Sequence, residues 1–261
     1  MKLCEKIRVI YGKEFGKYPQ CNCVLIGKSC LIDSGAETVK EMKVETILNS
    51  HWHEDHIAMN KIADIVYIHE LDRDAVVSYE EFERRYGIGE FARLFVNFEF
   101  CDTVETFDDG DVFKFEGVEV EVIHTPGHSA GHCCFLLDGK ILYLGDVDLT
   151  PFGPWYGCLD CDVSDFVKSI EKLEKMADDV YYAVPAHGKV VSEGLVEKLK
   201  NYKRIIIDRD TKIKELAARG ENPVGKGIIY RRFPEPKEIY EHFEKIMVEK
   251  HLTASLNSKN F

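Results

Sequence analysis

Short apolar runs separated by turns fill much of the first part of the chain. Alternating apolar and polar residues predict half-buried strands, and runs rich in Val, Ile and aromatic residues predict buried strands. Residues 5–33 contain such runs, with turns at Tyr11-Gly12 and Gly27-Lys28. The same patterns predict later strands at 46–49, 66–69, 112–115, 118–124, 132–137, 141–144 and 180–184.

Apolar residues at helical spacing mark other segments. Residues 57–62 predict a short helix, residues 70–100 a helical insertion that overhangs a site, and residues 163–176 a helix with one apolar face. After the last predicted strand, two helices are expected at 195–218 and 236–256, separated by a region rich in Gly and Pro. We therefore expect a main domain over residues 1–193 and a helical extension over residues 194–261 packed on it.

The composition is that of a globular protein with a full core. The chain has 261 residues, of which 45% are hydrophobic and 31% charged. No apolar run reaches the roughly 18 residues that cross a bilayer, and residues 1–6 carry charges where a signal peptide is apolar. Nine cysteines, an odd number without an export signal, favour free thiols. We expect a cytoplasmic protein without a membrane segment, and a homo-oligomer remains open.

The balance of charged residues indicates which class of partner the protein binds. Lys and Arg number 34 against 46 Asp and Glu, a net charge of −12. This balance argues against a nucleic-acid surface, because phosphate binding depends on clustered Lys and Arg. Basic pairs in the last quarter, such as Arg231-Arg232, are typical of solvated helix surface. A small molecule is therefore the expected partner.

Residues 51–56, His-Trp-His-Glu-Asp-His, concentrate metal-binding side chains. In an extended segment alternate side chains point the same way, so His51 and His53 can hold one ion. Asp55 and His56 follow where a helix is predicted, and they can face a second ion. First-row divalent metals accept imidazole and carboxylate ligands readily. The stretch therefore predicts two metal ions side by side.

Three later segments supply further candidate ligands at the ends of predicted strands, where sites are commonly built. Each places one His or Asp beside Gly or Pro: Thr125-Pro-Gly-His128, Leu144-Gly-Asp146 and Val184-Pro-Ala-His187-Gly. Alone, each residue is more typical of a hydrogen-bonded core histidine or a turn aspartate. Together with residues 51–56, they predict the rest of a dinuclear site.

The H-x-H-x-D-H pattern of residues 51–56 and the three later segments resemble the signature of the metallo-β-lactamase superfamily. The likeness extends from about Cys21 to His187. It implies an α/β fold, a four-layer αββα sandwich with two sheets face to face and helices outside. The helical extension at the carboxyl end resembles that of glyoxalase II and of related short β-lactamase-like hydrolases.

The resemblance also implies a role for each residue of the site. The first ion would be held by His51, His53 and His128, the second by Asp55, His56 and His187, with Asp146 bridging both. Asp33 would orient the ligand loops, although a turn after a strand explains Asp33-Ser-Gly equally well. The implied cofactors are two divalent metal ions, zinc first, with iron or manganese as alternatives.

Differences between this sequence and known members of the superfamily narrow the range of expected activities. Zinc β-lactamases have another residue in place of the bridging aspartate, so Asp146 speaks against antibiotic hydrolysis. Residues 149–157 replace the glutathione-binding stretch of glyoxalase II. Phe152, Trp155 and Tyr156 in this segment are candidates for the apolar wall of a substrate pocket. Ordinary loop packing explains them equally well.

The expected function is metal-dependent hydrolysis of an ester, thioester or lactone by a hydroxide held between two ions. Asp55 would act as ligand and as proton acceptor. The alternatives are a phosphodiesterase or ribonuclease and a mononuclear iron sulfur dioxygenase. The sequence does not fix the substrate, nor whether the C-x-x-C pair Cys158 and Cys161 has a chemical role.

Overall fold

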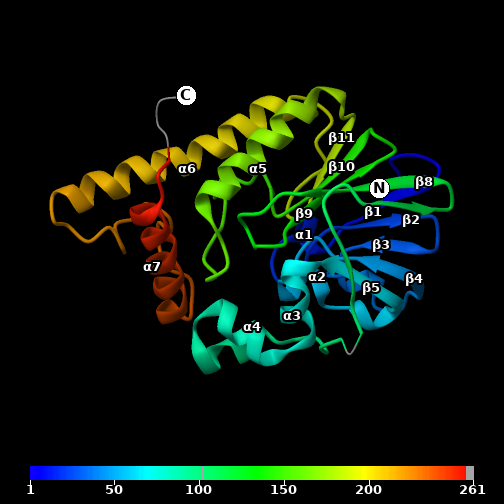
Figure 1. Cartoon of the computed structure of the whole chain (residues 1–261), viewed down its shortest axis with the longest axis horizontal. Helices are drawn as coiled ribbons and strands as arrows, with labels where there is room; N and C mark the ends of the chain where they lie inside the picture. The colour runs from blue at the N-terminus through cyan, green and yellow to red at the C-terminus, as the bar shows by residue number, and fades with distance from the viewer. Residues whose placement is uncertain (102, 257–261) are drawn as a thin grey trace.

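The protein, described here as a computed structural model of residues 1–101 and 103–256, contains two β-sheets packed face to face (Figure 1). The first sheet has its strands in chain order: β1 (Ile7–Ile10), β2 (Cys23–Ile26), β3 (Cys30–Ile32), β4 (Val44–Leu48), β5 (Ala63–His69) and β6 (Glu105–Phe107). The second runs in the order β11 (Tyr182–Pro185), β10 (Ile141–Gly145), β9 (Cys133–Leu137), β8 (Val118–His124) and β7 (Val112–Phe115).

Helices flank the sheets and extend from one end of the sandwich (Figure 1). In chain order they are α1 (Lys13–Gly16), α2 (Glu54–Ile57), α3 (Glu70–Val77), α4 (Tyr79–Tyr86), α5 (Val163–Met176), α6 (Leu195–Ala218) and α7 (Lys237–Thr253). Short 3-10 turns are η1 (Glu37–Val39), η2 (Asn60–Ile62), η3 (Gly89–Phe95) and η4 (Ala177–Asp179). This mixed arrangement of two sheets and covering helices confirms the predicted αββα fold class.

Helix α5 shows why some boundaries were predictable. Its apolar residues recur at helical spacing, and the resulting face, which includes Val163, Phe166 and Ile170, is buried. The carboxylate of Asp162 caps the first turn by accepting the backbone N–H groups of Ser164 and Asp165 at 2.8 and 2.9 Å. Helices α5 and α6 begin and end at the predicted residues.

The prediction of a helix over residues 57–62 was wrong about where the helix begins. Helix α2 begins at Glu54, inside the histidine cluster, and a separate 3-10 turn covers Asn60–Ile62. His53 adopts extended backbone angles and precedes a first turn that contains Glu54 and Asp55. Negative side chains are favourable at a helix N-terminus, so these acids stabilise the early start.

The terminal helix α7 is shorter than the predicted 236–256. It begins at Lys237, after Pro236, and ends at Thr253. The last part of the predicted extension, residues 257–261, lies outside the described residues. The division between a main domain and an extension at residue 193 remains a prediction.

Strand direction brings the candidate ligand loops together. Two antiparallel pairings separate β8 from β10, so these strands run the same way, and β11 is parallel to β10. Their carboxyl ends therefore lie at one edge of the second sheet. The loop after β4 joins this edge through the N–H of Cys133, which donates to the carbonyl of Ser50 at 2.8 Å.

The nine cysteines within the described residues are free thiols, as predicted, and all except Cys4 are buried. None of the helices in residues 1–101 and 103–256 combines the length and apolar character that a membrane crossing requires.

Candidate metal centre

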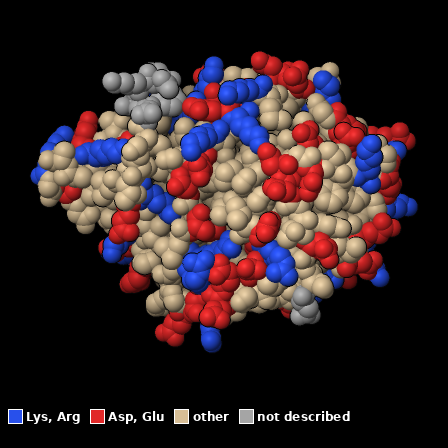
Figure 2. Space-filling model, viewed as in Figure 1, with Lys and Arg blue, Asp and Glu red and all other residues tan. Residues whose placement is uncertain are grey.

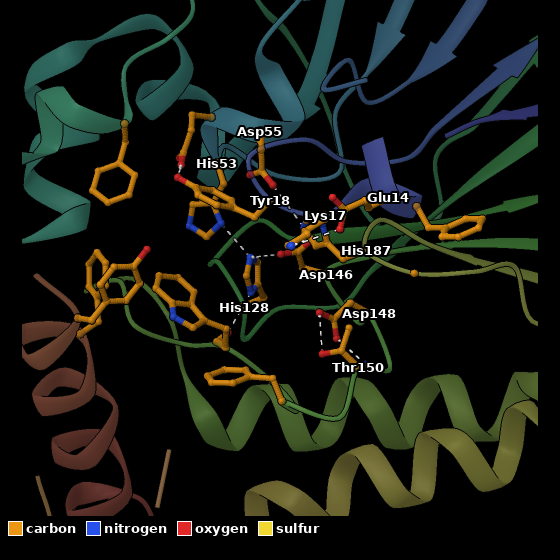
Figure 3. Close-up of a pocket in the computed structure, with 18 of the residues that line it drawn as sticks. Glu14, Lys17, Tyr18, His53, Asp55, His128, Asp146, Asp148, Thr150 and His187 are labelled. Atoms are coloured by element: carbon orange, nitrogen blue, oxygen red, sulfur yellow. Dashed lines mark hydrogen bonds and ion pairs between the residues drawn. The ribbon is translucent and has the colours of Figure 1, made fainter. Parts of the chain in front are cut away.

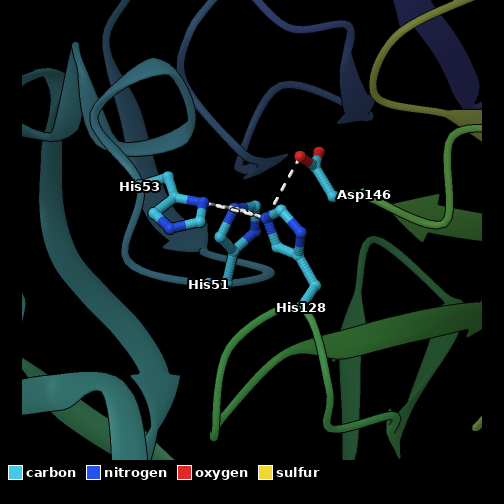
Figure 4. A group of neighbouring side chains, drawn as sticks. All are labelled: His51, His53, His128 and Asp146. Atoms are coloured by element: carbon cyan, nitrogen blue, oxygen red, sulfur yellow. Dashed lines mark hydrogen bonds and ion pairs between the residues drawn. The ribbon is translucent and has the colours of Figure 1, made fainter. Parts of the chain in front are cut away.

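Three imidazoles converge on one point at the end of the sandwich (Figure 4). His51 and His53 follow β4, and His128 follows β8. Nε2 of His51 lies 2.9 Å from Nδ1 of His53, and Nε2 of His128 lies 3.1 and 2.8 Å from these two atoms. All three residues are buried. Three ring nitrogens this close together are suited to surround one cation.

A second group lies beside the first, with Asp146 between them. Oδ1 of Asp146 lies 3.0 Å from Nε2 of His56 and 3.2 Å from Nε2 of His187. Oδ2 of Asp146 instead lies 3.2 Å from Nε2 of His128. Asp55 completes the second group, with Oδ2 3.4 Å from Nε2 of His187. The structure thus brings all seven predicted ligands together in two neighbouring groups, the division that the family resemblance implied.

Hydrogen bonds on the outer side of each ring determine which nitrogen carries the proton. Nδ1 of His128 donates to the carbonyl of Trp155 at 2.9 Å, and Nδ1 of His187 donates to the carbonyl of Gly16. Nδ1 of His56 faces Oδ2 of Asp33 at 2.7 Å. Because these oxygens accept, each neutral ring presents the lone pair of Nε2 to the centre.

Two buried atoms at the centre lack a hydrogen-bond partner among the described residues. Nε2 of His56 and Oδ1 of Asp146 are buried, and neither makes a well-formed hydrogen bond to any described residue. A buried polar atom without a partner is costly, and a neutral ring nitrogen facing a carboxylate repels it, so the centre needs positive charge from bound protons or from a cation. A cation between these atoms would satisfy them together. The donor set therefore fits divalent metal ions.

The pKa values distinguish the two groups. Burial, together with neighbouring imidazoles, lowers the pKa of His51 and His53 well below its usual range. Burial opposes protonation at His187 too, but Asp146 and Asp55 raise the pKa of His187 to about 10. Asp33 and Asp146 likewise outweigh burial and raise the pKa of His56. In the metal-free protein, protons therefore collect on the second group.

Asp33 lies directly behind His56. Its Oδ1 accepts the backbone N–H of Ser50 at 2.7 Å, and its Oδ2 accepts the hydroxyls of Ser50 and Tyr143, each at 2.7 Å. Asp33 has a φ of 53°, which is uncommon for a residue other than glycine. These contacts place Asp33 where the predicted positioning role requires it.

His132 is a buried neighbour of the ligands that the sequence reasoning missed. Its Nε2 accepts the backbone N–H of Asp146 at 3.0 Å, and burial and His128 lower the pKa of His132 to about 3. Gly145 has a φ of 52°, and a Cβ there would lie 2.5 Å from Nε2 of His132. The available signal was the second histidine in the run Gly127-His-Ser-Ala-Gly-His132.

Glu54 is a second residue whose role was missed. Its Oε1 accepts the hydroxyl of Tyr18 at 2.7 Å, and its Oε2 accepts the hydroxyl of Tyr86. Burial, with the charge of Asp55, raises the pKa of Glu54 to about 7. Glu54 thereby joins the N-terminal loop to α4 across the edge of the site. Its only sequence signal was its place inside the histidine cluster.

Arg85 of α4 connects the helical insertion to the ligand loops. Its Nη1 donates to Asp72 and to Asp160, each at 3.1 Å. Asp160 also accepts the indole N–H of Trp52 at 3.0 Å, and Asp72 accepts the hydroxyl of Ser129 at 2.5 Å. Trp52 and Ser129 are neighbours of ligand residues in the chain, so the insertion supports both ligand loops.

A pocket of about 560 Å³ opens in front of both groups (Figure 3). This volume lies within the range of small-molecule sites. His53, Asp55, His128, Asp146 and His187 face the pocket. Most of the remaining wall is aromatic: Phe15, Tyr18, Tyr86, Phe95, Phe152, Trp155, Tyr230, Tyr240 and Phe243. Phe152 and Trp155 thus lie where they were predicted.

Tyr156 does not lie where it was predicted. It is fully buried and is absent from the pocket wall among the described residues. Its hydroxyl pairs with Nε2 of His251 in α7 at 2.7 Å, and the guanidinium of Arg209 lies 5.8 Å from its ring. A buried tyrosine hydroxyl needs a polar partner, and the terminal helices supply it through His251 and Arg209.

Cys158 and Cys161 lie behind the first ligand group. Sγ of Cys158 is 3.5 Å from Nε2 of His53, the nitrogen that points away from the other ligands. The thiol of Cys161 donates to the carbonyl of His128 at 2.8 Å. Burial raises the pKa of Cys158 well above its usual range, so this thiol stays protonated.

Comparison with known proteins supports one family. The family model for the metallo-beta-lactamase superfamily matches residues 17–187. A metallo-beta-lactamase family protein from Thermus thermophilus superposes with a TM-score of 0.73 at 19% identity, over 96% of this chain and 93% of that one.

Several curated relatives are much longer than this chain. Lactamase-like protein aptB of Emericella nidulans is 26% identical over 62% of this chain, which spans only 44% of that protein. The atrochrysone carboxyl ACP thioesterase of the same organism is 24% identical over 84% of this chain and 70% of its own length. The ligand geometry and the family match agree: the chain belongs to the metallo-beta-lactamase superfamily.

Proposed function

We propose that the protein is a hydrolase that binds two divalent metal ions and cleaves an ester, thioester or lactone. The observation that carries the proposal is the position of Asp146, which faces one ligand group with each carboxylate oxygen at the floor of an aromatic pocket. A ligand set dominated by imidazole suits zinc first, with iron or manganese as alternatives.

Two bound ions would lower the pKa of a water between them to about 7 and polarise the scissile oxygen. The residues of the chain would accept the proton and hold the ligand rings in position. Asp55 lies in the pocket wall beside His187 and can accept the proton of an attacking water. Asp33, Gly16 and Trp155 hold the rings of His56, His187 and His128 in place through their Nδ1 atoms.

The pocket wall favours a neutral acyl substrate over a phosphodiester. Its charged residues outside the ligand groups are Glu14, Lys17, Glu54 and Asp148, and Lys17 lies 3.3 Å from Glu14. On the face shown in Figure 2, basic side chains are interspersed with acidic ones rather than gathered in one patch. Such a surface lacks the positive field that would attract a polyanion. The thioesterase name of one relative agrees with an acyl substrate.

Metal content should separate the roles of Asp146 and His187. Purified protein reconstituted with zinc should bind about two ions per chain, because the donors form two groups. Asp146→Ala should reduce occupancy at both positions, whereas His187→Ala should leave about one ion, as measured by elemental analysis. His242→Ala, a histidine of α7 outside the ligand groups, serves as the matched control. Equal metal content in all four proteins would contradict the ligand assignment.

Metal binding should release protons at neutral pH. Neighbouring carboxylates raise the pKa of His187 to about 10 and hold the pKa of His56 well above its usual range in the metal-free protein, so both rings must lose a proton to become ligands. We expect about two protons released per chain at pH 7. Calorimetric titration of zinc in buffers with different ionisation enthalpies measures this number. A binding enthalpy that is independent of the buffer would show that the second group is not a metal site.

Acyl transfer chemistry should exceed phosphoryl transfer. Zinc-loaded protein should hydrolyse acyl thioesters of N-acetylcysteamine with a higher kcat/KM than bis-p-nitrophenyl phosphate, RNA or a β-lactam, because the pocket wall is largely aromatic and its lysine, Lys17, is paired with Glu14. The chelator-treated protein is the control. Efficient RNA cleavage without thioester hydrolysis would favour a nuclease, and oxygen uptake with one bound iron would favour a dioxygenase.

A further inference from the structure

Seven aromatic rings of the pocket wall form a connected set, here called the aromatic cage. We infer that the aromatic cage binds a flat, ring-containing acyl group, an inference that rests on the proposed hydrolysis of an acyl substrate. The members come from the insertion, the loop after β10 and the carboxyl-terminal segment: Tyr86, Phe95, Phe152, Trp155, Tyr230, Tyr240 and Phe243.

Ring contacts join all members of the cage. Phe243 is central, with its ring centroid 5.3 Å from that of Trp155 and 6.0 Å from those of Tyr86 and Tyr240. Phe95 stacks on Tyr86 at 4.9 Å. Tyr230 extends the series, with its centroid 5.7 Å from that of Tyr240 and 5.3 Å from that of Phe152. Aromatic rings prefer such offset and edge-to-face contacts, which a planar guest ring can continue.

Polar contacts behind the rings hold the cage in one arrangement. The indole N–H of Trp155 donates to the hydroxyl of Tyr230 at 2.7 Å, and the hydroxyl of Tyr86 donates to Glu54. Arg209 donates to the carbonyls of Phe152 and Pro154, and its guanidinium lies 5.0 Å from the ring of Phe152. A preorganised wall favours a rigid ligand, because a flexible chain loses more conformational entropy on binding.

The cage begins at the metal ligands themselves. The ring of His53 lies 5.6 Å from that of Trp155 and stacks on Tyr86 at 5.9 Å, and the backbone carbonyl of Trp155 accepts Nδ1 of His128. A substrate whose scissile carbonyl lies at the metal centre would therefore place the attached acyl group between these rings.

A neutral ring fits the cage better than a quaternary ammonium group. Aromatic cages can bind such cations through their ring faces. Glu54 is the acid of the pocket wall that contacts a cage hydroxyl, and each of its oxygens already accepts a tyrosine hydroxyl. Of the other acids of the wall, Glu14 belongs to α1, and Asp148 lies near His187.

The test compares acyl groups on one leaving group. Zinc-loaded protein should hydrolyse 2-naphthoyl-N-acetylcysteamine with a kcat/KM about tenfold above that of the octanoyl thioester. Phe243→Leu should reduce this ratio about fivefold, and Phe152→Leu, at a position 38% exposed, should lower it in the same direction without a folding problem. Phe113→Leu, in β7 and outside the pocket wall, should leave the ratio unchanged.

Binding measurements separate this inference from the proposed function. Calorimetry with 2-naphthoate and octanoate, which share the carboxylate, should show tighter binding of 2-naphthoate, weakened by Phe243→Leu. If that difference appears but no thioester is hydrolysed, the cage assignment stands and the proposed function fails. Thioester hydrolysis with equal or greater preference for octanoyl would overturn the cage assignment and leave the function intact. Binding of tetramethylammonium that is tighter than binding of 2-naphthoate would also overturn it.

Discussion

The carboxylate of Asp146 fixes the spacing of the two ligand groups, because its oxygens face His56 and His187 on one side and His128 on the other. Its own position is determined by its backbone. The N–H of Asp146 donates to His132, and its carbonyl accepts the hydroxyl of Tyr202 in α6. A strand end, a buried histidine and a terminal helix thus meet at one residue. Carboxylate oxygens and ring nitrogens held this close to one another need positive charge between them. The other residues of the site are arranged around this need.

The ligand rings are oriented from outside by oxygen atoms that contact their Nδ1 atoms. Trp155 links this support to substrate binding, since its carbonyl holds His128 while its ring forms part of the aromatic wall. Arg85 provides a similar link on the other side, because the insertion that contributes Tyr86 to the pocket also reaches Trp52 through Asp160. A movement of the aromatic pocket wall would therefore also move the histidines that are expected to hold the metal ions. Metal binding and acyl selectivity should respond together to changes in these loops.

Much of the fold and most of the site could be predicted from local sequence. Helices α5 and α6 combine a clear apolar period with distinct ends, and the ligand residues are chemically distinctive and follow apolar strands. The residues that were missed depend on contacts between distant segments. Glu54 meets Tyr18, 36 residues away, and Tyr156 meets His251, 95 residues away. The pattern of apolar residues along the chain does not reveal such pairs, so the sequence could not show that Tyr156 is buried against α7 rather than in the pocket wall.

Crystals of the zinc-loaded protein, measured on both sides of the zinc absorption edge, would test the central claim most directly. The account predicts two anomalous peaks on opposite sides of the Asp146 carboxylate, one among His51, His53 and His128 and the other among Asp55, His56 and His187. A single peak confined to the first group would contradict the dinuclear assignment. The absence of any peak near Asp146 in fully loaded protein would contradict the metal centre itself.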